Sequence, residues 1–314
     1  MPHTRLRRGV RLRRGAGALI ALALTCVAFP GATVSCAEDG PAAPPPPPPA
    51  EPATSDEAAL RLLRAAVERQ GGKELADAGA LRSFRVEFGR VKAFVEDDSE
   101  SASGVKSGSG ELSEFVIDWL HHDDAASSLR TSWVTSADGK RVAQAVIGTR
   151  DAFWISADGV TQNVTRDSHP EDVEQLLAQR RLTEALLDVA VLRKMLADGS
   201  VWKSVTDAAH PGTALRREPP KGSGLHLTLW FDAETLDPRW VRVEPSEADA
   251  ATLHYEFEYD AERPKVSGAT LRFPFKTHVF EQKAKDAPLR RTLDLYAAAV
   301  KFNTLTLSDF APPR

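Results

Sequence analysis

The stretch Ala251-Thr-Leu-His-Tyr-Glu-Phe-Glu-Tyr259 decides the fold class of this chain. Its apolar and polar side chains alternate strictly, which is the period of a β-strand with one buried face. The apolar positions are Leu253, Tyr255, Phe257 and Tyr259, and the polar ones are His254, Glu256 and Glu258. One-sided alternation is typical of an antiparallel sheet with one face in water. We therefore expect Glu256 and Glu258 to be ordinary carboxylates on the wet face.

The same alternation recurs along most of the chain. It appears in 84–88, 115–119, 129–133, 225–231, 271–279 and 293–299. Asp138-Gly139 and Asp158-Gly159 separate such runs and predict tight hairpin turns, and Asp232–Pro238 predicts a longer hairpin connection. Pro274 lies inside one run, which implies an edge strand or a bulge, because proline cannot donate to the ladder. We predict a single curved antiparallel sheet.

Helical patterns occur in two places. Thr54-Ser55-Asp56-Glu57 offers capping side chains to a first helix, and Gly71-Gly72 is expected to end it. A second pattern begins after Ser168-His169-Pro170 and continues to about Asp198-Gly199. We expect its apolar region, Val173–Leu196, to cover the concave side of the sheet.

The N-terminus has the marks of an export signal. Six arginines and no acid occur in Met1–Arg14, and an apolar run follows from Ala16 to Phe29. This run is shorter than the about 20 residues that span a bilayer, so cleavage is favoured over an uncleaved anchor. We assign residues 1–36 to a signal segment, 37–54 to a proline-rich linker and 55–314 to one β domain.

Cys36 is a candidate lipidation site. Ala32-Thr-Val-Ser-Cys36 resembles a lipobox, in which a bacterial lipoprotein is cleaved and its new N-terminal cysteine is lipidated. Thr33 stands where leucine is usual, and the alternative is ordinary cleavage near Ala37. The following linker contains the unbroken run Pro44–Pro49, a stiff spacer that would hold the domain away from a membrane.

Charge and cysteine content exclude other classes. The formal net charge of the 314 residues is −4, with no basic stripe of the kind that binds nucleic acid. The two cysteines, Cys26 and Cys36, both precede the β domain, which therefore has neither a disulfide nor a thiolate metal site. An exported domain of this kind depends on its hydrophobic core for stability.

The sequence offers no evident catalytic or metal centre. His121-His122-Asp123-Asp124 is its densest group of metal-type ligands, but adjacent strand residues point to opposite faces, so a solvated turn is favoured. No hydrolase elbow, zinc-protease motif or phosphate loop is present. We expect no enzyme activity, no cofactor and no metal, and a hydrolase with a dispersed site is the least favoured alternative.

Large aromatic side chains occupy the apolar phase of the strands. On a curved sheet such residues line a lipid-sized cavity or pack as a filled core, and both alternatives remain open. The candidates for cavity lining are Phe84, Phe88, Phe115, Trp119, Tyr255, Phe257 and Phe273.

Three segments resemble the LolA/LolB-like superfamily of outer-membrane lipoprotein carriers and receptors and their lipoprotein-sorting relatives. The first is Arg61-Leu-Leu-Arg-Ala-Ala-Val-Glu-Arg-Gln-Gly-Gly-Lys-Glu-Leu-Ala76, which precedes the first strand, expected within Leu81–Val95. The second is the closing stretch Val300-Lys-Phe-Asn-Thr-Leu-Thr-Leu-Ser-Asp-Phe-Ala-Pro-Pro313, and Leu271-Arg-Phe-Pro-Phe-Lys276 also fits. The resemblance implies a mostly β, α+β fold: a half-open, strongly curved antiparallel barrel with helices covering its concave side.

The resemblance also implies a function. Proteins of this superfamily bind acyl chains of lipoproteins or related lipids, and a ligand-gating arginine lies on an early strand, for which Arg85 and Arg90 are the candidates. The expected protein is a monomeric, lipid-anchored outer-membrane lipoprotein that faces the periplasm. The alternative is a structural or interaction module of the cell envelope without cargo.

Overall fold

The structure is a computed structural model of the chain. It describes residues 55–76, 82–94, 111–121, 127–137, 140–149, 153–157, 159–165, 167–170, 200–206, 210, 212–218, 225–245, 251–259, 264–267, 271–284 and 286–311, and also 172, 173, 176, 177, 180, 183, 184, 186 and 187. The expected signal segment with Cys36, the linker and the serine- and glycine-rich 99–110 lie outside these residues.

The described strands form one 14-stranded sheet. In chain order they are β1 (Ser83–Ala93), β2 (Glu111–His121), β3 (Ser127–Ala137), β4 (Lys140–Gly148), β5 (Phe153–Ala157), β6 (Val160–Val164), β7 (Val201–Val205), β8 (Thr213–Glu218), β9 (Leu225–Phe231), β10 (Pro238–Pro245), β11 (Thr252–Glu258), β12 (Lys265–Ser267), β13 (Lys276–Gln282) and β14 (Arg290–Phe302). Their order is β6-β5-β4-β3-β2-β1-β14-β13-β11-β10-β9-β8-β7, with β12 beside β14.

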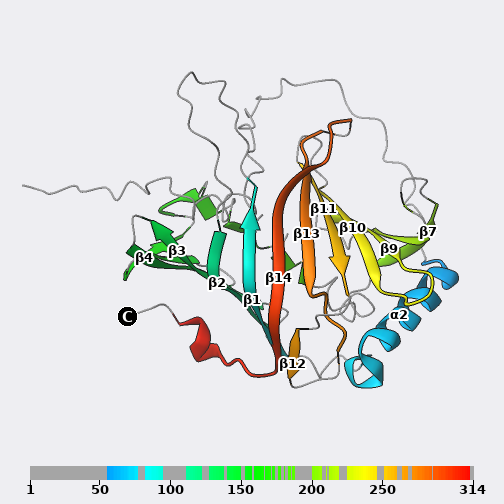
Figure 1. The fold of residues 1–314 in the computed structure, drawn as a ribbon, viewed down its shortest axis with the longest axis horizontal. Coiled ribbons are helices and arrows are strands. Elements are labelled where there is room, and N and C mark those ends of the chain that lie inside the picture. Colours follow the sequence, from blue (N-terminus) through cyan, green and yellow to red (C-terminus); the bar gives the residue numbers. More distant parts are fainter. Residues whose placement is uncertain are drawn as a thin grey trace, which may run out of the picture.

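Every pair along this path is antiparallel, and only the short β12 runs parallel to its neighbour β14. The sheet does not close, because β6 and β7 are its two ends. The predicted single antiparallel sheet is thus confirmed. Figure 1 shows that the sheet bends, with β2–β4 on one side of β1 and β14 and β9–β11 on the other.

The hairpin connections occur where the sequence predicted them. Ala137 pairs with Lys140 and Ala157 with Val160, so each connection has two residues. Gly159 adopts φ +78°, a value that glycine reaches without strain. The longer connection between β9 and β10 is held by Asp232, whose carboxylate accepts hydrogen bonds from the Thr235 backbone N–H (2.8 Å) and hydroxyl (3.1 Å).

Helix α2 (Glu57–Ala76) packs its apolar side into the main hydrophobic cluster through Ala59, Leu63, Ala66 and Val67. Its N-terminus is tied to β7, since the Asp56 N–H donates to the Trp202 carbonyl at 2.8 Å. The expected end at Gly71-Gly72 is wrong, because the helix continues to Ala76. The Arg272 N–H donates to the Gln70 carbonyl (2.8 Å), so the last turns also contact the segment before β13.

A second helical segment is described in part, between Pro170 and Leu187. Val173 packs with Phe153 and Val164 of β5 and β6, and Leu186 and Leu187 enter the same main cluster as α2. The expected helix therefore forms where its apolar stripe is described. No described helix is both long and apolar enough to cross a membrane.

The sheet has two distinct faces. We call inner the face that carries Phe84, Val86, Tyr255 and Phe257 together with the main hydrophobic cluster, and outer the opposite face. The outer face is not uniformly wet. A second cluster of Leu120, Ile147, Leu305 and Phe310 lies on it, under the chain end that contains the short helix η1 (Leu307–Phe310).

Pro274 does not lie in a strand. The expected strand over 271–279 begins only at Lys276 (β13), and β13 is central, between β11 and β14. The expected edge position or bulge at Pro274 is therefore wrong. A residue without an N–H fits the irregular segment before the strand, where the Phe275 N–H resumes bonding to the Glu258 carbonyl at 3.0 Å.

Candidate functional site

The seven aromatic residues proposed from the sequence all belong to the main hydrophobic cluster. Each is at most 8% exposed. They come from β1 (Phe84, Phe88), β2 (Phe115, Trp119), β11 (Tyr255, Phe257) and the segment before β13 (Phe273). The burial of the six strand residues on one face follows from strand alternation, but whether the seven line a cavity stays a prediction.

Register explains how the rings meet. Phe84 lies opposite Trp119, and Phe88 lies opposite Phe115, on neighbouring strands. The ring centroids of these pairs are 5.3 and 5.4 Å apart. Such tilted contacts add about 0.5–1.5 kcal/mol each beyond the burial of area. The β1–β2 end of the inner face is therefore well packed.

Polar atoms of three aromatic side chains within the apolar inner face have no hydrogen-bond partner among the described residues. They are the Tyr255 hydroxyl, the Tyr259 hydroxyl and the Trp133 indole N–H. Burial raises the pKa of both tyrosines, so the hydroxyls stay protonated donors. A buried unpaired polar group costs about 1–3 kcal/mol, which makes these atoms the places where a ligand oxygen would be stabilised most.

A buried arginine lies between the second helical segment and the sheet. Arg180 is 9% exposed, and its guanidinium donates to the Thr149 carbonyl (2.6 Å) and the Glu184 carboxylate (3.2 Å). It borders a small pocket of about 20 Å³ with Leu129, Val146 and Phe153. This space is close to that of one water molecule.

The two candidate gating arginines lie on the outer face. Arg85 donates to Asp118 from Nε (2.6 Å) and Nη2 (3.1 Å), and this hydrogen bond is the main reason why the pKa of Arg85 is raised. Arg90 is exposed, with its guanidinium carbon 5.8 Å from the centre of the Tyr296 ring. Contact of Arg85 with an inner-face ligand would require the Asp118 pair to break.

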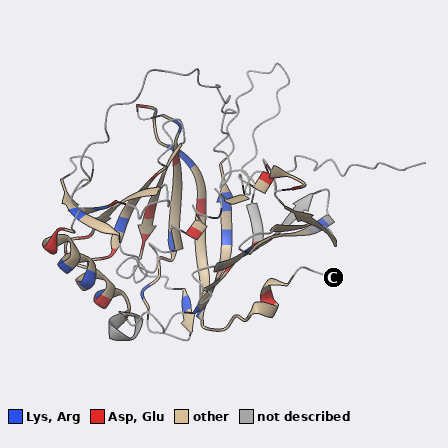
Figure 2. Cartoon of the chain, turned by 180° about the vertical axis from the view of Figure 1, so that it is seen from behind, with Lys and Arg blue, Asp and Glu red and all other residues tan. Residues whose placement is uncertain are grey.

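The structure describes only some of the other residues that the sequence singled out as candidate ligands or lipidation sites. Cys36 and His122–Asp124 lie outside the described residues, and His121 ends β2. Among the residues that the structure describes, no group of three or more histidine, cysteine or acidic side chains is arranged to hold a metal ion. Figure 2 shows acidic and basic residues interspersed over the drawn strands and α2.

Sequence reasoning missed the polar clusters of the outer face. Glu258 is not an ordinary surface carboxylate, because it accepts hydrogen bonds from Lys276 (2.8 Å) and His278 (2.7 Å). Burial acts to raise the pKa of Glu258, but these two partners outweigh it and lower the pKa. No sequence signal joins the three residues, because they meet only through the β11–β13 register.

Comparison with known proteins identifies neighbours in structure alone. No protein-family model matches the sequence, and no curated protein matches it. A solved domain from Vibrio parahaemolyticus, described as an outer membrane lipoprotein-sorting protein, has a TM-score of 0.46 at 11% identity, over 81% of this chain and 96% of that one. A LolA superfamily protein from Nitrosomonas europaea has a TM-score of 0.42 at 13% identity, over 81% and 97%.

Proposed function

We propose that this chain is an exported, non-catalytic envelope protein that binds acyl chains of lipids or lipoproteins on the inner face of its sheet. The observation that supports this most is the set of unpartnered polar atoms, Tyr255, Tyr259 and Trp133, within an otherwise apolar face. An acylated ligand has the matching chemistry, since its chain is apolar and its ester oxygens accept hydrogen bonds.

Room for a chain would come from movement of the helices. Helix α2 contributes Leu63 and Val67 to the hydrophobic cluster of the inner face, and the second helical segment contributes Leu186 and Leu187. Burial of ten CH2 groups yields about 8 kcal/mol before the cost of displacing these contacts. In this proposal Arg180, at the border of the small inner pocket, contacts the polar end of the ligand.

The chain is proposed to act as a monomer that is attached to the outer membrane through Cys36. The segment 37–54 would then carry the domain several nanometres from the bilayer, at about 3.1 Å for each residue in the polyproline conformation. Membrane attachment and acyl-chain binding belong together, because a carrier or receptor must meet its ligand at the bilayer.

The second candidate is a structural envelope module with a filled core. The close ring contacts of Phe84 with Trp119 and of Phe88 with Phe115 favour it. Lipid extraction and mass spectrometry of the protein purified from a bacterial envelope separate the two. A stoichiometric acylated lipid supports binding, and a lipid-free protein that also fails to bind a fluorescent fatty acid ester rejects it.

A variant pair sharpens this test. Tyr255→Phe with Tyr259→Phe removes both hydroxyls while the shape of the core is kept. We expect affinity for a fatty acid ester to fall about tenfold, with little change for a plain alkyl probe, because only the ester offers an acceptor. Tyr296→Phe on the outer face is the matched control. Equal affinity of the double variant and the wild type for the ester would contradict the role of the hydroxyls.

A further inference from the structure

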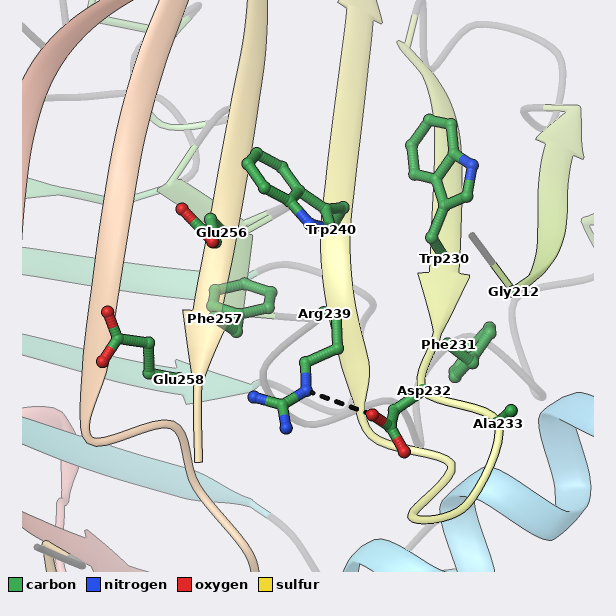
Figure 3. A pocket seen from close by; sticks show the side chains of 10 residues that line it. All are labelled: Gly212, Trp230, Phe231, Asp232, Ala233, Arg239, Trp240, Glu256, Phe257 and Glu258. Atoms are coloured by element: carbon green, nitrogen blue, oxygen red, sulfur yellow. Dashed lines mark ion pairs between the residues drawn. The ribbon is translucent and has the colours of Figure 1, made fainter. Parts of the chain in front are cut away.

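A second pocket lies on the outer face, away from the proposed acyl-chain site. It has a volume of about 350 Å³, at the lower end of the range of small-molecule sites. The side chains of Trp230, Trp240, Glu256 and Glu258 border it, together with the Arg239–Asp232 ion pair (3.6 Å). Figure 3 shows Trp240 and Glu256 on neighbouring strands, with Arg239 directed toward Asp232.

One row of residues across five strands builds this site. Trp230 of β9 pairs with Trp240 of β10, Trp240 with Glu256 of β11, and Glu256 with His278 of β13. Ala214 of β8 lies opposite Trp230, and its small side chain adds little bulk at that end of the row. Directly opposed residues in such a ladder have Cβ atoms about 4.5–5.5 Å apart, so the Glu256 carboxylate lies beside the Trp240 indole.

The aromatic part of the row is held in place. His210 stacks on Trp240 with centroids 4.6 Å apart and planes at 22°, and its ring meets Trp230 edge-on at 5.0 Å. The Arg242 guanidinium lies over the Trp230 ring at 5.6 Å, so a cation already occupies that indole. Trp240 also borders the pocket, and it lies beside the Glu256 carboxylate.

The charges around the pocket are unequally satisfied. Glu258 is paired with Lys276 and with His278, and Asp232 is paired with Arg239. Both His278 nitrogens are within 2.7 Å of carboxylate oxygens, one of Glu258 and one of Asp294, so His278 has no donor left for Glu256. Within the described part of the chain, Glu256 forms no ion pair and no hydrogen bond through its side chain. Its negative charge is therefore the uncompensated one in the pocket.

Trp230 supplies an independent sign of a ligand. It is only 2% exposed, and its indole N–H has no hydrogen-bond partner among the described residues. A buried indole N–H normally finds an acceptor. Trp230 borders the same pocket as Glu256 but lies two strands away from it, with Trp240 between them. An oxygen of a bound molecule is the acceptor that the Trp230 N–H lacks.

We propose that this pocket binds an amino alcohol or its ester, with the ammonium group at Glu256 and Trp240 and, in an ester, a more distant oxygen at the Trp230 N–H. The carboxylate supplies the counter-charge, and the indole attracts a cation through its ring quadrupole. Choline and ethanolamine have this chemistry, either as free molecules or as phospholipid headgroups. The site is separate from the inner face and does not depend on acyl-chain binding.

Calorimetric titration of the mature protein with choline and with ethanolamine tests the proposal. We expect binding of both, and at least tenfold weaker binding of 3,3-dimethyl-1-butanol, the uncharged analogue that has the shape of choline. Glu256→Gln should weaken choline binding at least tenfold. Glu234→Gln removes the same charge at an exposed position of the β9–β10 connection and should bind choline like the wild type.

Several outcomes would overturn the proposal. They are equal binding of choline and its uncharged analogue, unchanged choline binding by Glu256→Gln, and no binding of either amine at millimolar concentration. Vesicles of phosphatidylcholine identify the source of the ligand, because sedimentation with vesicles that free choline prevents indicates a headgroup, and binding of free choline alone indicates a soluble amine. A fluorescent fatty acid ester should bind Glu256→Gln as well as the wild type, so this test is independent of the inner-face site.

Discussion

At the scale of single residues, the largest electrostatic effect is expected at Asp118. This carboxylate is fully buried on the outer face, between Arg85 and Arg130 of the two neighbouring strands, whose side chains are 27% and 23% exposed. Asp118→Asn leaves two guanidinium groups facing each other without a counter-charge. Loss of one partner of a fully buried pair costs about 3–5 kcal/mol. Because both arginines are partly hydrated, we expect about 2–3 kcal/mol, measured by urea unfolding.

The matched control for Asp118 is on the same strand. Glu114 pairs with Arg141, but both side chains are more than 60% exposed. Glu114→Gln should change the free energy of unfolding by less than about 0.5 kcal/mol, as is usual for surface ion pairs. Equal losses in the two variants would show that burial of Asp118 has no special effect on stability.

Asp294 gives the fold a pH dependence in the acid range. It is buried, it accepts a hydrogen bond from Arg291 Nε at 2.7 Å, and its carboxylate oxygen lies 2.7 Å from His278 Nδ1. Burial acts to raise the pKa of Asp294, but these partners outweigh it and lower the pKa. A lowered pKa in the folded state contributes stability above the unfolded value of about 3.9, and this contribution is lost as the pH falls through the folded pKa.

Asp294→Asn should therefore destabilise the protein at pH 7 and have little effect near pH 2. The expected difference at pH 7 is about 1–3 kcal/mol, the range for hydrogen bonds to a buried charged group. Unfolding curves at both pH values give the measurement, with Asp286→Asn at an exposed position as the control. A loss that is the same at pH 7 and pH 2 would mean that the charge of Asp294 contributes nothing.

The sequence predicts which face of the sheet a side chain lies on, because polar and apolar residues alternate along each strand. Alternation places Phe84, Phe115 and Tyr255 on the buried face, and all three are buried. It does not predict which residues lie opposite each other, since that depends on strand order and register. The Asp118 cluster and the row from Trp230 to His278 are products of register, and for this reason the sequence did not indicate them.

At the scale of elements, the chain end after β14 acts as a cover for the outer face. Phe310 (3% exposed) and Leu305 pack on Leu120 and Ile147. The Arg130 guanidinium donates to the Asp309 carbonyl at 2.5 Å, which fixes η1 to β3. Asn303 begins this segment in a left-handed conformation (φ 54°), and its side chain accepts hydrogen bonds from the Arg82 and Ser83 N–H groups.

Phe310→Ala should destabilise the protein by about 3 kcal/mol, since truncation of a buried phenylalanine leaves a cavity. Leu307→Ala, one turn away and 66% exposed, should cost less than about 0.5 kcal/mol. Thermal unfolding of both variants measures the difference. If the two variants unfold at the same temperature, the chain end does not cover the outer face in solution.

The sequence predicts the ends of strands and helices where nearby turn or capping residues determine them. β3 pairs with β4 on either side of Asp138-Gly139, and β5 pairs with β6 on either side of Asp158-Gly159, as expected. The end of α2 was not predictable, because a glycine pair weakens a helix without forcing it to stop. Pro274 was assigned to a strand by periodicity alone, although the strand begins beyond it.

At the scale of the whole molecule, the path of the sheet joins the two halves of the sequence. β1 pairs with β14 (Val86 opposite Val300), so a contact across more than two hundred residues lies at the centre of the sheet. The two ends, β6 and β7, are adjacent in sequence order and are joined through the second helical segment. Local patterns cannot predict a strand pairing over so many residues, because it depends on the order of the strands in the sheet.

The last prediction concerns where the molecule is held in the cell envelope. If Cys36 is lipidated, the mature wild-type protein partitions into detergent and its mass exceeds that of the chain from Cys36 by the acyl groups. Cys36→Ala should then move the protein to the aqueous phase, because the proposed membrane attachment depends on the lipid at this residue. Cys26→Ala is the control, since this cysteine lies in the apolar run that cleavage removes. A wild-type protein that begins near Ala37 and stays in the aqueous phase would contradict the anchor, and the β domain would then act as a soluble exported protein.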